Sequence, residues 1–477
     1  MAYLQWGDPV DDAYVSFVYA RNFLEGNGLT FNIGDRVEGY SNFLWMMLAT
    51  LAGAQHIPFF AQFLGFLFWL ADIFLVYLLA RKIKFGAWAL APALLSALDL
   101  RCAVWSIEGL ETSFYLFGIL LTFLLYNQQK MRCLWAFPAL ATAMTRPEGV
   151  TVFAAVVLHR CYSLLKRKGR PTGNDAIALG IFFLGFSFYN LWRLYYFESE
   201  ILPNTYYARG GAGNPLLGFI YVVYNLWSGW GPFALVLIFM VIAGITIKDK
   251  KTSIEERAPT FWLLMGTAVV IFTGGDWMPN ARFLVPLLPF AYIYSAYFAK
   301  QKGNGGKVLF CLLLLTNITS AVLYEARDSF SKKWARNQAS FYMPTAEWLI
   351  THGAQAKKVV LSDVGYITYY SRIHAIDTLG LTNKNLARVR GGAAWATDLD
   401  YVFNEHPDFI ISMVRNYNGV EMGHTAFDRE IVSDERFKTT YEQVAEIEGY
   451  HAEERALGDF RLRKYTVAFK IYQRKSE

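Results

Sequence analysis

The chain has 477 residues, of which 54% are hydrophobic and 17% aromatic, and its mean hydropathy is +0.24. Such a composition is too apolar for a soluble protein of this length, so it predicts a polytopic membrane protein. The net charge of +6 does not indicate a nucleic-acid-binding protein, because the basic residues fall in short clusters between apolar runs.

The first predicted element is a helix over residues 10–24, "VDDAYVSFVYARNFL". Its apolar residues lie mostly along one side, which is typical of an amphipathic helix on a membrane surface, and a second such helix is predicted over 39–55. The first helix begins with two adjacent carboxylates, Asp11 and Asp12, which could simply cap it. The preceding "MAYLQWGDP" is too short to be a signal peptide or a span, so we expect the native chain to be longer at its N-terminus.

Ten apolar runs that could cross a bilayer follow, at 58–80, 85–101, 109–126, 132–145, 149–165, 175–197, 230–247, 258–273, 283–299 and 306–324. Basic clusters follow alternate runs, at 81–84, 129–132, 166–170, 248–251 and 300–307. The positive-inside rule places these clusters in the cytoplasm and every other loop outside. The predicted domains are an outward segment with two juxtamembrane helices (1–56), a transmembrane core of about ten spans (57–324) and an extracytoplasmic domain (325–477).

From about residue 325 the composition turns polar, and strand-like runs at 357–363, 373–377 and 407–412 alternate with helix-like stretches. This alternation predicts a small C-terminal α/β domain. Asp363 and Asp377 end two of the strands, where an acid either meets a ligand or caps the next turn. The four cysteines form no C-x-x-C motif, which argues against a zinc site or a disulfide framework.

Charged and polar residues gather in the predicted outward loops. Ionisable groups are costly at membrane depth, so their concentration on one side predicts an internal aqueous site. Adjacent acids suit general-base catalysis, because like-charge repulsion raises the pKa of one of them. The candidates beside Asp11 and Asp12 are Glu38, Glu108, Glu111, Arg146, Glu148, Asn204, Asp276 and Arg282.

Seven segments in this order resemble the GT-C superfamily of glycosyltransferases that use polyprenyl-phosphate sugars. They are the Asp-Asp pair, "VEGYSNFLW", "GLET", "RPEG", "LPNTYYAR", "GGDWMPNARFLVPLLP" and "LSDVGYITYYS…IDTLGL". The sequence is most similar to the branch that contains terminal arabinofuranosyltransferases of mycobacterial wall assembly and pilin arabinosyltransferases. The resemblance spans about residues 10–390, and the end of the tail departs from the pattern, which leaves the acceptor open.

The resemblance implies that Asp11 is the general base, and that Asp12 supports it or binds a sugar hydroxyl. Arg146 and Arg282 are placed to bind the donor phosphate, because a guanidinium matches a phosphate in a bidentate fork, although ion pairs with Glu148 and Asp276 are the alternative. Aromatic rings could stack on a sugar or anchor the chain at the interface. Further predicted substrate-binding residues are Tyr40, Tyr207, Trp277 and Asp363.

No cofactor is required by this chemistry. Asp11, Asp12, Glu38 and Asp276 are hard ligands that suit a divalent cation, but their spacing does not demand one. The expected partners are the lipid donor, a glycan, glycolipid or protein acceptor, and the inner membrane of a bacterium, with the site facing the periplasm. Transfer of another sugar, such as mannose or aminoarabinose, is an alternative, and so is a secondary transporter, although no internal repeat is visible.

Overall fold

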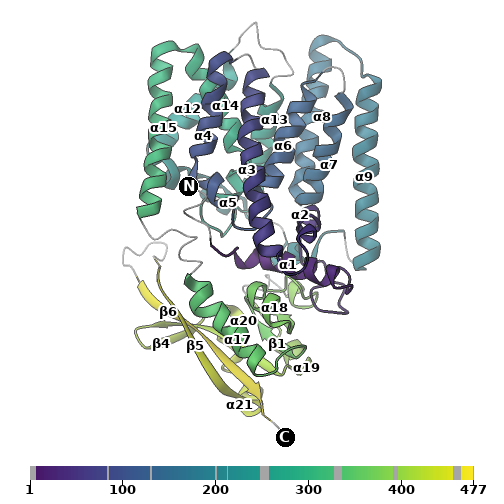
Figure 1. Ribbon diagram of the computed structural model, residues 1–477, viewed down its shortest axis with the longest axis vertical. Helices are drawn as coiled ribbons and strands as arrows, with labels where there is room; N and C mark the ends of the chain where they lie inside the picture. The colour runs from purple at the N-terminus through teal and green to yellow at the C-terminus, as the bar shows by residue number, and fades with distance from the viewer. Residues whose placement is uncertain are drawn as a thin grey trace.

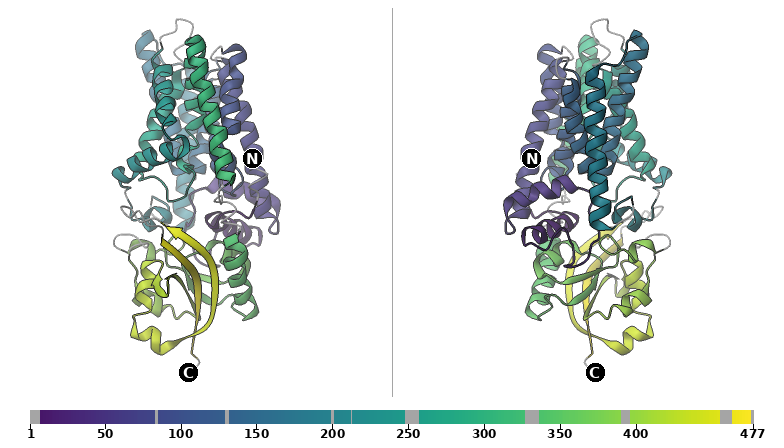
Figure 2. Two further views of the ribbon diagram at one scale, coloured as in Figure 1. Left: turned by 90° about the vertical axis from the view of Figure 1, so that its left-hand side faces the viewer. Right: turned by 90° about the vertical axis from the view of Figure 1, so that its right-hand side faces the viewer.

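The computed structural model describes residues 7–82, 85–128, 132–198, 201–211, 213–247, 257–326, 336–389, 396–454 and 463–475. Most helices run side by side in one bundle, and a sheet domain from the C-terminal part of the chain lies at one end of it (Figure 1). Helices α1 (Asp11–Leu24) and α2 (Phe43–Ala49) lie between the bundle and that domain, as Figure 2 shows from two sides.

The bundle is built from apolar helices whose outward side chains remain exposed. On α9, for example, Leu184, Phe188 and Leu191 are 66–76% exposed, which suits a hydrocarbon environment rather than water. The helices are α3 (Ile57–Lys82), α4 (Leu90–Leu98), α5 (Leu100–Trp105), α6 (Thr112–Tyr126), α7 (Ala136–Thr145), α8 (Val150–Arg167), α9 (Gly173–Phe197), α11 (Pro215–Trp230), α12 (Phe233–Thr246), α13 (Ala258–Phe272), α14 (Leu288–Gln301) and α15 (Gly303–Ala326).

Each of the ten apolar runs predicted from the sequence contains helix. By length and composition, four helices in the described ranges could cross a membrane, or five if a bent pair counts as one span, and several other apolar helices are shorter. That all ten runs cross the bilayer therefore stays a prediction. The basic cluster at 248–251 and most of the cluster at 129–132 lie outside the described residues.

Helix α11 is an apolar element that the sequence analysis missed, because the predicted run 230–247 begins where α11 ends. It meets α12 at an angle of 111°. Gly231 makes this turn with a φ of +55°, which glycine adopts without strain, and Pro232 follows it.

Helix α1 is buried, so the prediction that it lies on a membrane surface is wrong. Residues 13–22 of this helix are all buried. One side packs on the bundle and the other on α18 (Gly365–Ser371) of the C-terminal domain, with Tyr14 against the rings of Tyr366 and Tyr369 at centroid distances of 5.0 and 5.4 Å. The periodicity that suggested one apolar side could not reveal the second partner, which lies about 350 residues away in the sequence.

The C-terminal domain is α/β, as predicted. Its six-stranded sheet has the order β2-β1-β3-β6-β5, with β4 paired to β3; β1 is parallel to β2 and β3, and the other pairs are antiparallel. Its strands are β1 (Lys358–Leu361), β2 (His374–Asp377), β3 (Phe409–Tyr417), β4 (Val420–Gly423), β5 (Tyr441–Glu454) and β6 (Arg463–Arg474). Its helices are α17 (Met343–Thr351), α18, α19 (Leu399–Asn404), α20 (Ala426–Ile431) and α21 (Glu435–Thr440). The first three strands match the predicted runs, whereas the hairpin of β5 and β6 was not predicted.

Candidate active site

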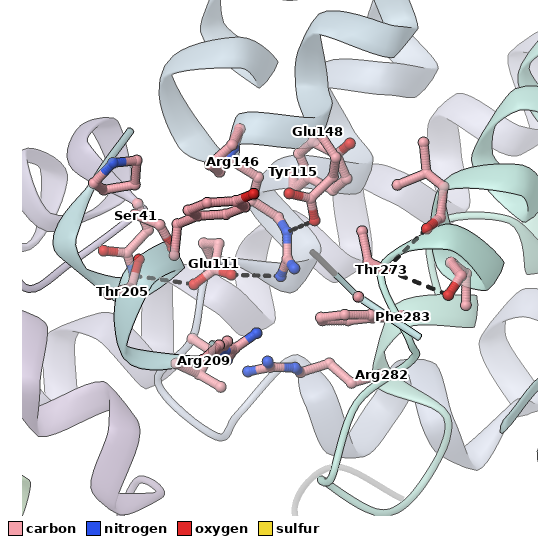
Figure 3. A pocket seen from close by; sticks show the side chains of 18 of the residues that line it. Ser41, Glu111, Tyr115, Arg146, Glu148, Thr205, Arg209, Thr273, Arg282 and Phe283 are labelled. Atoms are coloured by element: carbon pink, nitrogen blue, oxygen red, sulfur yellow. Dashed lines mark hydrogen bonds and ion pairs between the residues drawn. The ribbon is translucent and has the colours of Figure 1, made fainter. Parts of the chain in front are cut away.

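A cavity of about 590 Å³ lies where α1, the loop before α2 and the ends of several bundle helices meet. Its volume is in the range of small-molecule sites. Figure 3 shows acids, arginines and aromatic rings from distant parts of the sequence pointing into it. Of the predicted site residues, those that line the cavity are Asp12, Tyr40, Glu111, Arg146, Glu148 and Arg282.

Asp12 presents a carboxylate to this cavity without a hydrogen-bond partner among the described residues. Burial raises the pKa of Asp12, and the positive charges of Arg282 and Arg209 oppose that rise. An unengaged carboxylate with a raised pKa that faces a cavity is suited to accept a proton from a bound hydroxyl group.

Two guanidinium groups, Arg209 and Arg282, lie near one another in the cavity (Figure 3). Arg282 Nε donates to Asp276 Oδ2 at 2.6 Å, and this buried ion pair fixes its side chain. Among the described residues no carboxylate lies within ion-pairing distance of Arg209. Two neighbouring cations, one of them without a counterion among the described residues, form a site suited to an anionic group such as phosphate.

Arg146 forms ion pairs with two carboxylates, whereas Arg209 and Arg282 are the two arginines suited to bind an anionic group. Its Nη1 donates to Glu111 Oε1 at 2.7 Å and its Nε donates to Glu148 Oε1 at 2.5 Å. Burial alone would raise the pKa of Glu111, but Arg146, Arg282 and a hydrogen bond from Asn42 Nδ2 (3.0 Å) hold it below its usual value. This triad forms a charged wall whose geometry is already satisfied within the protein. The predicted alternative of an ion pair is thus observed for both Arg146 and Arg282.

The cavity continues along one side of α13 as an apolar surface. Trp262, Gly266, Val269, Val270 and Phe272 of this helix line it. Phe272, at the end of α13, is 66% exposed, so the apolar lining reaches the outer surface of the bundle. The polar part of the cavity is therefore joined to a groove that matches a hydrocarbon chain.

Asp11 points away from the cavity and holds the C-terminal domain. Its two carboxylate oxygens accept the backbone N–H groups of Gly365 (3.1 Å) and Tyr366 (2.7 Å), which are the first two residues of α18. Neither acid caps α1, because its N-cap residue is Val10 and no side chain bonds there. The alternative that Asp11 and Asp12 cap their own helix is therefore wrong, and Asp11 instead caps a helix of another domain.

Asp363 lies beside Asp11 at the same joint and accepts a hydrogen bond from the Tyr342 hydroxyl at 2.7 Å. Burial raises the pKa of both acids, and the charge of Asp363 adds to the rise at Asp11. Neither residue is among those that line the cavity.

Two further predicted site residues bind other parts of the protein. Glu38 accepts two hydrogen bonds from Arg193 of α9, at 2.7 and 2.5 Å, and both side chains are buried. Asn204, in α10 (Asn204–Ala208), donates from Nδ2 to the carbonyl oxygens of Gly380 (2.7 Å) and Leu381 (2.9 Å). These contacts position the segments that carry the cavity wall.

Three more predicted residues do not line the cavity. Tyr207 packs under Arg388, 4.6 Å from its ring centroid, while its neighbour Tyr206 is the ring that lines the cavity. Trp277 is 68% exposed and lies outside the cavity lining. Glu108 is buried, and its carbonyl oxygen accepts the N–H of Val10 at the start of α1.

Sequence reasoning overlooked Arg209 and Asn42 as site residues. Arg209 is the one charged residue of the outward motif "LPNTYYAR". A search for basic residues in each outward loop would therefore have identified it. Asn42 lies in "GYSNF" and gives no such signal, because its role depends on Glu111, which lies 69 residues further along the chain.

The comparisons with known proteins come from the sequence and from the fold. A family profile described as "Domain of unknown function (DUF8728)" matches residues 330–469, a range that includes most of the described C-terminal domain. The sequence matches no curated protein. The fold is similar to two crystal structures of ArnT from Cupriavidus metallidurans, one bound to undecaprenyl phosphate and one in the apo state.

Both ArnT structures have a TM-score of 0.52 and 11% sequence identity to this chain. The alignment with the lipid-bound structure covers 98% of this chain and 95% of the ArnT chain. The alignment with the apo structure covers 97% of this chain and 94% of the ArnT chain. A likeness at this identity establishes the fold, and it does so over almost the whole length. The chain therefore has the GT-C type of membrane fold, as the sequence predicted, with a C-terminal α/β domain.

Proposed function

We propose that this protein is a membrane glycosyltransferase that moves a sugar from a polyprenyl-phosphate donor to an acceptor hydroxyl. The observation that carries the proposal is the carboxylate of Asp12, which has no hydrogen-bond partner among the described residues. It shares a cavity with Arg209 and Arg282, and that cavity joins the apolar groove of α13. The groove suits a prenyl chain and the two cations suit its phosphate. The ArnT structure that contains undecaprenyl phosphate supports a donor of the same chemical class.

In the proposed reaction Asp12 accepts the proton of the acceptor hydroxyl. The hydroxyl oxygen attacks the anomeric carbon from the side opposite the phosphate, and the bond from that carbon to the phosphate oxygen breaks. The departing polyprenyl phosphate gains a negative charge, which Arg209 and Arg282 stabilise. A single displacement leaves no covalent intermediate, so the anomeric configuration is inverted.

The geometry favours Asp12 over Asp11 as the base. Asp11 already accepts two backbone N–H groups and does not line the cavity. A general base has to reach the proton that it removes, and Asp12 is the member of the pair that faces the cavity.

The guanidinium groups of Arg209 and Arg282 also make a metal ion unnecessary for charge neutralisation, since two guanidinium groups can neutralise a phosphate by themselves. Among the described residues no group of three or more His, Cys, Asp or Glu side chains is placed to hold a metal ion. We propose that no divalent cation is required, so that transfer continues in excess EDTA.

Purified protein in lipid tests the proposed function directly. It should transfer sugar from a polyprenyl-phosphate donor and leave a soluble nucleotide sugar unused. Polyprenyl-phosphate arabinofuranose is the first donor to assay, followed by mannose and aminoarabinose donors, because the family resemblance favours the arabinosyltransferase branch. Turnover with the nucleotide sugar alone would contradict the proposal, and sealed vesicles that accumulate a solute without transfer would favour a secondary transporter.

The site is proposed to face the periplasm of a bacterial inner membrane. In a cysteine-free background, cysteines placed at Gln128 and Gly173 should resist an impermeant thiol reagent in intact spheroplasts, while cysteines at Asn385 and Glu430 should react. All four positions are exposed in the structure, so burial does not decide the result. The reverse labelling pattern would place the cavity on the cytoplasmic side.

A further inference from the structure

The C-terminal domain is fixed to the membrane unit through buried polar contacts on separate segments. Asn32, in the loop after α1, donates from Nδ2 to the carbonyl oxygen of Ala375 (3.0 Å) and accepts its N–H on Oδ1 (2.9 Å), as a paired strand would. Asp11 caps α18 at a second point. A tethered binding module would instead show few contacts across its boundary, so this domain is a fixed part of the molecule.

One loop of this domain, residues 378–383, reaches the cavity. Its shape is set by Asp377, whose carboxylate accepts the N–H groups of Leu379 and Thr382, each at 2.9 Å. Gly380 has a φ of +72°, and a Cβ at this position would lie 2.6 Å from the nitrogen of Ala387. The loop is therefore held in one conformation from within its own domain.

The membrane unit holds the same loop from the other side. Asn204 Nδ2 donates to the carbonyl oxygens of Gly380 and Leu381. Gly39 packs so closely that a Cβ there would lie 2.9 Å from the Leu381 oxygen and 2.7 Å from Thr382 Cγ2. Leu381 lines the cavity, and every other described lining residue belongs to the membrane unit.

We propose that the C-terminal domain forms the acceptor-side wall of the transfer site and that Leu381 limits the size of the acceptor. This inference rests on the proposed function. The donor enters along α13 within the membrane, so the wall contributed by the extramembrane domain adjoins the space left for the acceptor. A rigidly held side chain discriminates substrates by shape, because it cannot move aside at low cost. The domain matched by the DUF8728 profile thus acts in substrate selection.

Leu381→Trp and Leu381→Ala test this role, with Leu379→Trp as the matched control because Leu379 belongs to the same loop but does not line the cavity. In a membrane extract that supplies the native acceptor, Leu381→Trp should lower kcat/KM for the acceptor at least tenfold. Its KM for the lipid donor and its thermal stabilisation by undecaprenyl phosphate should stay within twofold of wild type. Leu379→Trp should retain transfer to the native acceptor, and Leu381→Ala should use bulkier glycoside acceptors that wild type rejects.

Three results would overturn the inference. The first is normal acceptor use by Leu381→Trp, and the second is an equal loss in the Leu379→Trp control, which would indicate a general disturbance of the loop. The third is a loss of undecaprenyl phosphate binding in Leu381→Trp, which would place Leu381 on the donor side. Failure of the proposed function itself is distinguishable, because wild-type protein would then transfer no sugar.

Discussion

Asp11 and Asp12 are adjacent in the sequence, yet their side chains point into different environments. For Asp12→Asn we expect transfer to fall about 10²–10⁴-fold, because the amide cannot accept a proton from the acceptor. Binding of undecaprenyl phosphate should persist, since Arg209 and Arg282 are unchanged, and the thermal stabilisation of the protein by this lipid measures its binding. Near-normal turnover of Asp12→Asn would exclude it as the base.

The activity of wild-type protein should also depend on pH in a definite direction. Because burial raises the pKa of Asp12, the residue keeps its proton to a higher pH than an exposed aspartate would, and the deprotonated form is the active base. The rate should therefore rise with pH through that raised pKa. In Asp12→Asn the residual rate should lose this rise, which a pH series of kcat/KM would reveal.

The neighbouring substitution Asp11→Asn should act on stability more than on chemistry. An asparagine can accept one of the two N–H groups of α18 but presents an NH₂ group to the other, so we expect a loss of about 1–3 kcal/mol in the free energy of unfolding. Gly365 packs so tightly that a Cβ at this position would clash with the carbonyl oxygen of Asp11, which leaves little room for the chain to adjust. Thermal unfolding in detergent measures the loss. A stable Asp11→Asn protein without activity would return the base to Asp11.

At the scale of secondary-structure elements, α13 carries the proposed lipid groove, and its two faces can be tested separately. Val269 lines the cavity, whereas Leu264 is 66% exposed and does not line it. Val269→Trp should raise the KM for a long-chain donor about tenfold by filling the groove, while Leu264→Trp should match wild type. The increase in KM caused by Val269→Trp should become smaller as the prenyl chain of the donor is shortened. Equal KM values for the two variants would place the lipid elsewhere.

The elements themselves were largely predictable, and their partners were not. Hydrophobic runs located helix in all ten predicted segments, because apolar length is a local property. The burial of α1 was missed, since it depends on α18, and so was the engagement of Asp11 by Gly365. The sequence analysis grouped Asp12, Glu111, Arg146 and Arg282 as candidate site residues because all four lie in predicted outward segments. It could not separate them from residues such as Asn204, whose partners lie in another domain.

At the scale of the whole molecule, the joint between the membrane unit and the C-terminal domain buries two acids next to each other. Burial raises the pKa of Asp363 to about 6, and Tyr342 opposes this rise, whereas Asp428, Asp12 and Asp377 add to it. Burial also raises the pKa of Asp11, to which Asp363 contributes. Unfolding returns both groups to water and to their usual pKa of about 3.8.

The sign of the resulting pH dependence follows from proton binding. Between pH 4 and 6 the folded protein binds more protons at Asp363 than the unfolded chain does, so this contribution to stability is complete below about pH 4 and is lost as pH rises to about 6. Asp363→Asn keeps an acceptor for the Tyr342 hydroxyl but cannot ionise, so it should flatten the decline of the melting temperature over this range. Asp400→Asn, at a side chain that is 82% exposed, serves as the control and should retain the wild-type slope. If the melting temperatures of Asp363→Asn and wild type decline in parallel between pH 4 and 6, the titration of Asp363 does not control the stability of the contact between the C-terminal domain and the membrane unit.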